Sequence, residues 1–152
     1  MSRSRNPRGT RAEDGPHIGA LLRMAWQRVR TRIYSGVQHD GYSDLNPAHV
    51  ALFRFETIDG RRPTQVAESM QITKQSINDL IRDLERHGYA QYRTDPSDHR
   101  ARLIHLTARG RRLQAAVQKY AIAAESELEQ ELGQERFREL HAILRKINKL
   151  SA

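Results

Sequence analysis

Apolar residues in the first third of the chain recur at helical spacing. From Ile18 onward they fall every three or four positions, which predicts a helix with one apolar stripe that is ended by Gly36 and the polar stretch 39–46. Asn46 and Pro47 then have the order of a helix cap and a first helical residue, so a second helix is predicted over 47–57. Apolar residues cover most of its surface, which is typical of a helix in the middle of a core.

Two shorter helices separated by a three-residue turn follow. Pro63 opens the first, over 63–70. Thr73 is the expected N-cap of the second, over 74–87, and Gly88 is its expected C′ residue. These lengths match a helix-turn-helix, whose second helix enters the major groove of DNA.

The rest of the chain predicts a hairpin and two more helices. Extended segments over 89–93 and 101–106 flank a polar tip over 94–100, which is typical of a β-hairpin. Thr107 caps a long helix from about Ala108, and Gly133 separates it from a last helix. That helix carries one apolar seam, formed by Phe137, Leu140, Leu144, Ile147 and Leu150. The predicted fold class is mainly α with a small β-hairpin wing: a winged helix-turn-helix plus a helical dimerisation domain.

Composition narrows the possible partners. The chain holds 26 Lys and Arg against 18 Asp and Glu, a net charge of +8, so nucleic acid is the first partner to consider. A merely soluble basic protein is the alternative, and an anionic membrane is disfavoured because no helix pairs an aromatic face with a lysine-rich one. There is no cysteine, which excludes disulfides and thiolate metal sites. With neither an apolar run of membrane-spanning length nor an apolar signal core, we expect a cytoplasmic protein.

The second helix of the predicted helix-turn-helix exposes a polar face. Opposite its apolar stripe lie amide and guanidinium groups, whose hydrogen bonds match base edges in the major groove. Its N-terminus suits phosphate, and arginines on a narrow hairpin suit a minor groove. The alternative is an ordinary solvated helix face. The predicted DNA-binding residues are Thr73, Lys74, Gln75, Ser76, Asn78, Arg82, Arg86, Arg93, Asp98, His99, Arg100 and Arg102.

The stretch from Thr73 to Leu113 resembles the MarR family of transcription regulators. The shared features are Thr73-Lys74-Gln75-Ser76, the Leu84-Glu85 and Gly88 helix end, Asp95-Pro96, Asp98-x-Arg100, and Leu106-Thr107 with Gly110. The resemblance implies an obligate dimer on a pseudo-palindromic operator of double-stranded DNA, usually released by a small aromatic or phenolic effector. It also implies that Arg100 enters the minor groove and that Asp98 braces it, while Gln75, Ser76, Asn78 and Arg82 face the major groove. Many relatives carry arginine where this chain has Asp79 and His99, and an acid where it has Arg82.

Three regions are predicted from these patterns. They are a flexible basic arm over 1–15, a DNA-binding domain over 43–107, and a dimerisation region formed by 16–42 and 108–152. A chain with only 38% hydrophobic residues suits a core that a partner completes. The expected dimer contacts are Ile18, Leu21, Leu128, Phe137, Leu140, Leu144 and Ile147, with packing inside one chain as the alternative.

Other kinds of site have weaker support. Trp26, Arg30, His49 and Phe53 are candidates for an effector pocket, although each is also explained as core or surface. The seven histidines are scattered without metal-ligand spacing, so no metal or cofactor is expected. No nucleophile is grouped with a base, and no catalytic residue is assigned. The alternatives to a ligand-responsive regulator are an architectural DNA-binding protein without an effector, and an interaction module or enzyme whose basic face serves another acidic partner.

Overall fold

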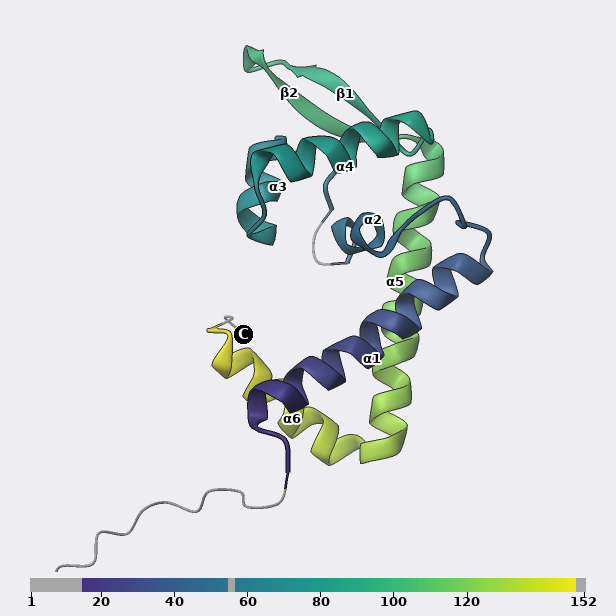
Figure 1. The fold of residues 1–152 in the computed structure, drawn as a ribbon, viewed down its shortest axis with the longest axis vertical. Helices are drawn as coiled ribbons and strands as arrows, with labels where there is room; N and C mark the ends of the chain where they lie inside the picture. The colour runs from purple at the N-terminus through teal and green to yellow at the C-terminus, as the bar shows by residue number, and fades with distance from the viewer. Residues whose placement is uncertain (1–14, 55–56, 150–152) are drawn as a thin grey trace, which may run out of the picture.

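The computed structural model describes residues 15–54 and 57–149. The elements along the described chain are α1 (Ile18–His39), α2 (Pro47–Leu52), α3 (Pro63–Met70), α4 (Lys74–Arg86), β1 (Ala90–Asp95), β2 (Asp98–Leu106), α5 (Ala108–Leu132) and α6 (Gln134–Ile147). The strands form one antiparallel hairpin. The hairpin, α3 and α4 lie at one end of the molecule, α6 and the start of α1 lie at the other, and α5 connects the two ends (Figure 1). The predicted fold class, mainly α with a hairpin wing, is confirmed.

Some sequence predictions fall on residues that the structure does not describe. Of the basic arm predicted over 1–15, only Gly15 is described, and Phe55 and Leu150 lie outside the described residues as well. No helix in the described ranges is both long and apolar enough to cross a membrane.

Of the two predicted signals for the end of the first helix, the polar stretch 39–46 is correct and Gly36 is wrong. Helix α1 continues through Gly36 to His39, and Gly36 is buried against α5. A Cβ atom at this position would overlap the ring of Tyr120, so the missing side chain is what allows the two helices to approach. Glycine acts here in packing, and its low helix propensity does not stop the helix.

Helix α2 is shorter than predicted. It ends at Leu52, and the next two amides close the turn by bonding only three residues back, Phe53 N to Val50 O at 3.2 Å and Arg54 N to Ala51 O at 3.3 Å. Phe53 remains buried beyond the helix end, with 5% of its surface exposed. The apolar side chain of Phe53 therefore reflects its place in the core. It does not indicate that the helix continues to residue 57.

The hydrophobic core at the hairpin end of the molecule is built around α4. Ile77, Ile81 and Leu84 are fully buried and belong to one cluster with residues of α2, α3 and the hairpin. Thr73 caps α4 by accepting a hydrogen bond from Ser76 N at 3.0 Å, and Gly88 follows its end with a φ of 75°. The capped start and the glycine end were both predicted from the sequence.

Helix α5 begins in close contact with the chain that leaves α4. Thr107 caps the helix, and its amide donates to Tyr89 O at 3.0 Å. A Cβ atom on Gly110 would overlap the same carbonyl oxygen. Glycine is therefore required at 110 by the approach of a backbone atom, which cannot rotate away as a side chain could.

Gly110→Ala should consequently lower the free energy of unfolding by about 1–3 kcal/mol, the usual cost of forcing an extra methyl group into a packed site. Chemical denaturation followed by circular dichroism measures it. Gly19→Ala is the matched control, since nothing lies within 4 Å of the added Cβ on that helical glycine. The control should be neutral or slightly stabilising. Equal stability of the two variants would contradict the packing role of Gly110.

Helix α6 leaves its apolar residues uncovered. None of its residues is buried, and Ile143 and Ile147 are 56% and 61% exposed. The start of α1 is similar, with Ile18 at 71%. We call these exposed side chains the apolar terminal surface, formed by Ile18, Leu21, Leu22, Leu140, Ile143 and Ile147. Phe137, Leu144 and Leu128, which were predicted as dimer contacts together with several of these, are half-buried.

Candidate nucleic-acid interface

Helix α4 presents a polar face to solvent. Gln75, Asn78 and Asp79 are exposed, as are Arg82 and Arg86 one to two turns later. At the start of the helix, the hydroxyls of Thr73 and Ser76 lie 2.8 Å apart. The helix N-terminus therefore combines backbone amides, two hydroxyls and the exposed Lys74, a set of groups that suits a phosphate.

Both arginines of this face are paired with an acid one turn earlier. Arg82 Nη1 lies 3.2 Å from Asp79 Oδ1, and Arg86 Nη2 lies 2.6 Å from Asp83 Oδ1. Asp83 is also held from the other side, because His49 Nε2 lies 2.9 Å from its second oxygen. Asp83 is thus bonded into the domain, whereas Asp79 has no bond to another element among the described residues.

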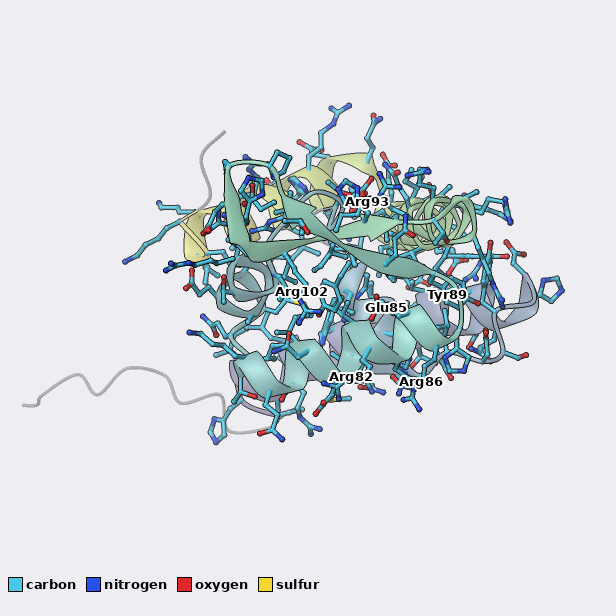
Figure 2. All side chains as sticks on the ribbon, turned by 90° about the horizontal axis from the view of Figure 1, so that it is seen from above. Arg82, Glu85, Arg86, Tyr89, Arg93 and Arg102 are labelled. Atoms are coloured by element: carbon cyan, nitrogen blue, oxygen red, sulfur yellow. The ribbon has the colours of Figure 1, made fainter. Side chains whose placement is uncertain are left out.

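The hairpin is joined to α4 through Tyr92. The Tyr92 amide donates to Glu85 Oε1 at 3.0 Å, and the Tyr92 hydroxyl donates to Asn78 Oδ1 at 3.3 Å. The Arg102 guanidinium lies 4.8 Å from the centre of the Tyr92 ring. Burial raises the pKa of Tyr92, which keeps its hydroxyl protonated as a donor. Glu85 and Arg102 lie between α4 and the hairpin, whereas Arg82 and Arg86 point away from the hairpin (Figure 2).

The tip of the hairpin is tighter than the predicted segment 94–100. The strands continue to Asp95 and resume at Asp98, so only two residues form the turn. Pairing passes from Thr94 with Arg102 to Asp95 with Asp98, which leaves residues 99–101 as a bulge on β2. Bulges redirect side chains away from the regular strand alternation.

Arg100 lies in this bulge. Its amide donates to Asp98 Oδ1 at 3.1 Å, so Asp98 holds the backbone that carries the arginine. The Arg100 side chain is exposed, and no group in the described part of the chain pairs with its guanidinium. His99 beside it is exposed too. Arg93 is on β1 and lies on the other side of the hairpin from Glu85 and Arg102 (Figure 2).

Sequence reasoning missed Arg62, which fixes the hairpin tip to the start of α3. Its Nε and Nη2 atoms lie 2.9 Å and 2.6 Å from Asp95 Oδ2, and its Nη1 lies 3.6 Å from Asp98 Oδ2. A guanidinium that holds one carboxylate with two nitrogens is a directional restraint. The only signal in the sequence was a pair of acids flanking a turn on a basic chain, which does not reveal a partner 33 residues earlier.

The restraint at Asp95 predicts a pH dependence. Hydrogen bonds from the side chain and backbone of Ser97, followed by the Arg62 contact, lower the pKa of Asp95 from 3.8 to about 2. A carboxyl group whose pKa is lower in the folded state stabilises the fold above its unfolded pKa. We expect this contribution to fade as the pH falls from about 4 to about 2. NMR titration of the Ser97 amide should follow it, and Ser97→Ala should move the midpoint upward. A Ser97 amide that titrates near pH 4 in the wild type would contradict the restraint.

The four candidate pocket residues lie in different surroundings. His49 and Phe53 are in the core, where His49 Nδ1 accepts from Asn46 N at 3.2 Å and burial lowers its pKa. Trp26 is 40% exposed, and the Arg54 guanidinium lies 4.4 Å from its ring centre. Arg30 is half-buried. Three cavities in the described ranges, with volumes of about 300, 400 and 730 Å³, are lined by other residues.

A capped helix with a polar face, preceded by a helix and a turn and followed by a basic hairpin, defines a winged helix-turn-helix DNA-binding protein. The MarR family model matches residues 43–101, which are the helix-turn-helix and most of the hairpin. A search of curated protein sequences finds no significant relative.

Solved structures extend the likeness over most of the chain. The transcriptional repressor CouR bound to a 23-mer DNA duplex is 26% identical, with a TM-score of 0.69 over 87% of this chain and 92% of that chain. CouR from Rhodococcus jostii RHA1 bound to p-coumaroyl-CoA is 25% identical, with a TM-score of 0.68 over 86% and 90%. Wild-type MarR from E. coli is 16% identical and shares the fold, with a TM-score of 0.70 over 89% and 98%. Residues 43–101 therefore match the MarR family of transcription regulators, and most of the chain has the fold of MarR-family structures.

Proposed function

We propose that this regulator binds a pseudo-palindromic operator as a homodimer, represses transcription there, and is released by a small aromatic or phenolic ligand. The observation that carries the dimer is the apolar terminal surface. Helix α6 has 14 residues and buries none of them within its own chain. Its contacts with α5 leave Leu140, Ile143 and Ile147 exposed, and a helix of that length gains most of its stability from packing its apolar face, so this face needs a surface to pack against.

A second copy of the chain is the partner that best fits this need. Symmetric dimers bury the same patch of both subunits, so one apolar surface per chain is sufficient. A two-fold dimer would also place two copies of α4 in successive major grooves, about 34 Å apart. Such spacing requires an operator with two related half-sites. The structure of CouR bound to a DNA duplex, which has a similar fold, supports this way of binding DNA.

Sedimentation and DNA titration test the proposal together. The purified chain should sediment as a dimer, and it should bind one selected duplex far more tightly than random DNA, with affinity falling steeply as salt rises. Equal affinity for every duplex would exclude specific regulation. A monomer at micromolar concentration would exclude the dimer.

The ligand part of the proposal is tested separately. CouR was solved with p-coumaroyl-CoA, an aromatic thioester. In this chain the Arg54 guanidinium, just after α2, lies over the ring of Trp26 on α1, and Arg30 on the same helix is close enough to Arg54 to affect it electrostatically. A ligand that binds only the folded chain raises its melting temperature. p-Coumaroyl-CoA and simple aromatic acids should be screened by thermal shift, and a hit should weaken operator binding. If none binds, an architectural DNA-binding protein without an effector becomes the better account.

A further inference from the structure

Asp79 is an unexpected residue on the DNA-facing side of α4. With 100° per residue, it falls in the middle of the face opposite Ile77 and Ile81, beside Gln75 and Arg86. Its side chain is 58% exposed. A carboxylate in this position is repelled by the phosphates of any duplex, so it lowers affinity for DNA in general.

Fold stability does not account for Asp79. Its one described ionic partner is Arg82, which is itself 67% exposed, and exposed pairs of this kind contribute about 0–1 kcal/mol. Asp83 provides the contrast on the same helix. That acid is 26% exposed and is held by both His49 and Arg86, so its place in the domain is explained by packing.

Base chemistry gives Asp79 a role. In the major groove cytosine presents an amine donor at N4, whereas guanine and thymine present acceptors that repel a carboxylate. Adenine presents its amine beside the N7 acceptor, which suits an amide better than a carboxylate. An exposed aspartate on a reading helix therefore favours cytosine and opposes the other three bases.

The neighbouring Arg82 completes the match to one kind of base pair. Guanidinium groups donate to guanine O6 and N7, and these atoms lie beside the cytosine amine in a G·C pair. Asp79 Oδ1 and Arg82 Nη1 are 3.2 Å apart, so an acceptor and donors are held side by side on the helix surface. One acceptor beside donors on the helix surface thus corresponds to one donor beside acceptors on the base pair.

We propose that Asp79 is a specificity-determining residue that accepts a hydrogen bond from the N4 amine of a cytosine in each operator half-site, with Arg82 donating to guanine. This inference rests on the proposed function, because it requires a sequence-specific operator. Asp79 increases discrimination at one symmetric position and decreases affinity for other DNA.

Selection from a random duplex library, with wild type, Asp79→Ala and Asp79→Asn, is the first experiment. The wild type should require cytosine at one position in each half-site by roughly tenfold to a hundredfold in affinity. Both variants should lose that preference, and Asp79→Ala should bind random duplex more tightly than the wild type. Glu135→Gln, on α6 at the far end of the molecule, removes one negative charge and should change neither property.

A base analogue makes the test specific to the amine. The selected operator is prepared with a cytosine analogue that lacks the exocyclic amine at the assigned position. The substitution should weaken the wild type and leave Asp79→Ala unaffected, as expected for two partners of one interaction. Thermal melting of each variant checks that the fold is retained.

The outcomes separate the two proposals. If the wild type selects no sequence, the proposed function fails. If it selects an operator and Asp79→Ala keeps the same preference at every position, the operator stands and the role of Asp79 is refuted.

Discussion

Arg100→Ala is expected to reduce the affinity of the dimer for its operator by roughly 1.5 to 4 orders of magnitude, because each dimer loses two groove contacts of roughly 1–3 kcal/mol each. The physical basis is the bulge on β2, in which Asp98 holds the Arg100 backbone while the guanidinium is exposed and unpaired in the described part of the chain. Fluorescence anisotropy with a labelled operator measures the change. The slope of log affinity against log salt concentration should also become less steep by about two, one for each lost cation.

Arg23→Ala is the control for Arg100→Ala. Arg23 is an exposed arginine near the start of α1 and is not part of the apolar terminal surface, so the control removes the same charge from the opposite end of the molecule. It should lower affinity only slightly. If the two variants bind the operator equally well, the hairpin does not contact DNA and the proposed interface is wrong.

Ile143→Asp is expected to convert the dimer into monomers and to abolish operator binding at concentrations where the wild type is saturated. The side chain is 56% exposed within one chain, and burying a carboxylate in an apolar interface costs several kcal/mol per copy. A monomer also loses the second half-site, and a second linked site is worth roughly 10²–10⁴ in affinity. Analytical ultracentrifugation and anisotropy on the same sample measure both effects.

Ile122→Asp is the control for the dimer variant. Ile122 is 57% exposed on α5, lies on the side of that helix opposite its buried stripe, and is not part of the apolar terminal surface. It should remain dimeric and bind the operator. A dimeric Ile143→Asp protein would show that the apolar terminal surface is not the interface.

Local signals were sufficient to predict α4 and its caps. Thr73 and Gly88 act on hydrogen bonds within a few residues of themselves, and the stripe of Ile77, Ile81 and Leu84 depends only on helical periodicity. The exposed polar face follows from the same periodicity, because residues opposite a buried stripe face solvent. For α4, the residues that determine its bounds and its exposed face are therefore close together in the sequence.

The predictions that failed depended on distant partners. Gly36 was expected to end a helix, but the ring of Tyr120 on α5 requires a glycine at that point inside it. The predicted hairpin tip was too long because the register of the two strands, which produces the bulge over 99–101, cannot be inferred from composition. The Arg62 contact with Asp95 was missed for the same reason, since an ion pair between remote residues leaves no periodic trace.

Hydroxyl-radical footprinting of the selected operator tests most directly whether two copies of α4 and the hairpin bind one duplex. We expect two protected half-sites related by a two-fold axis, with centres about one helical turn apart, and loss of both when Arg100 is replaced by alanine. One isolated half-site, or uniform protection of any sequence, would contradict the account.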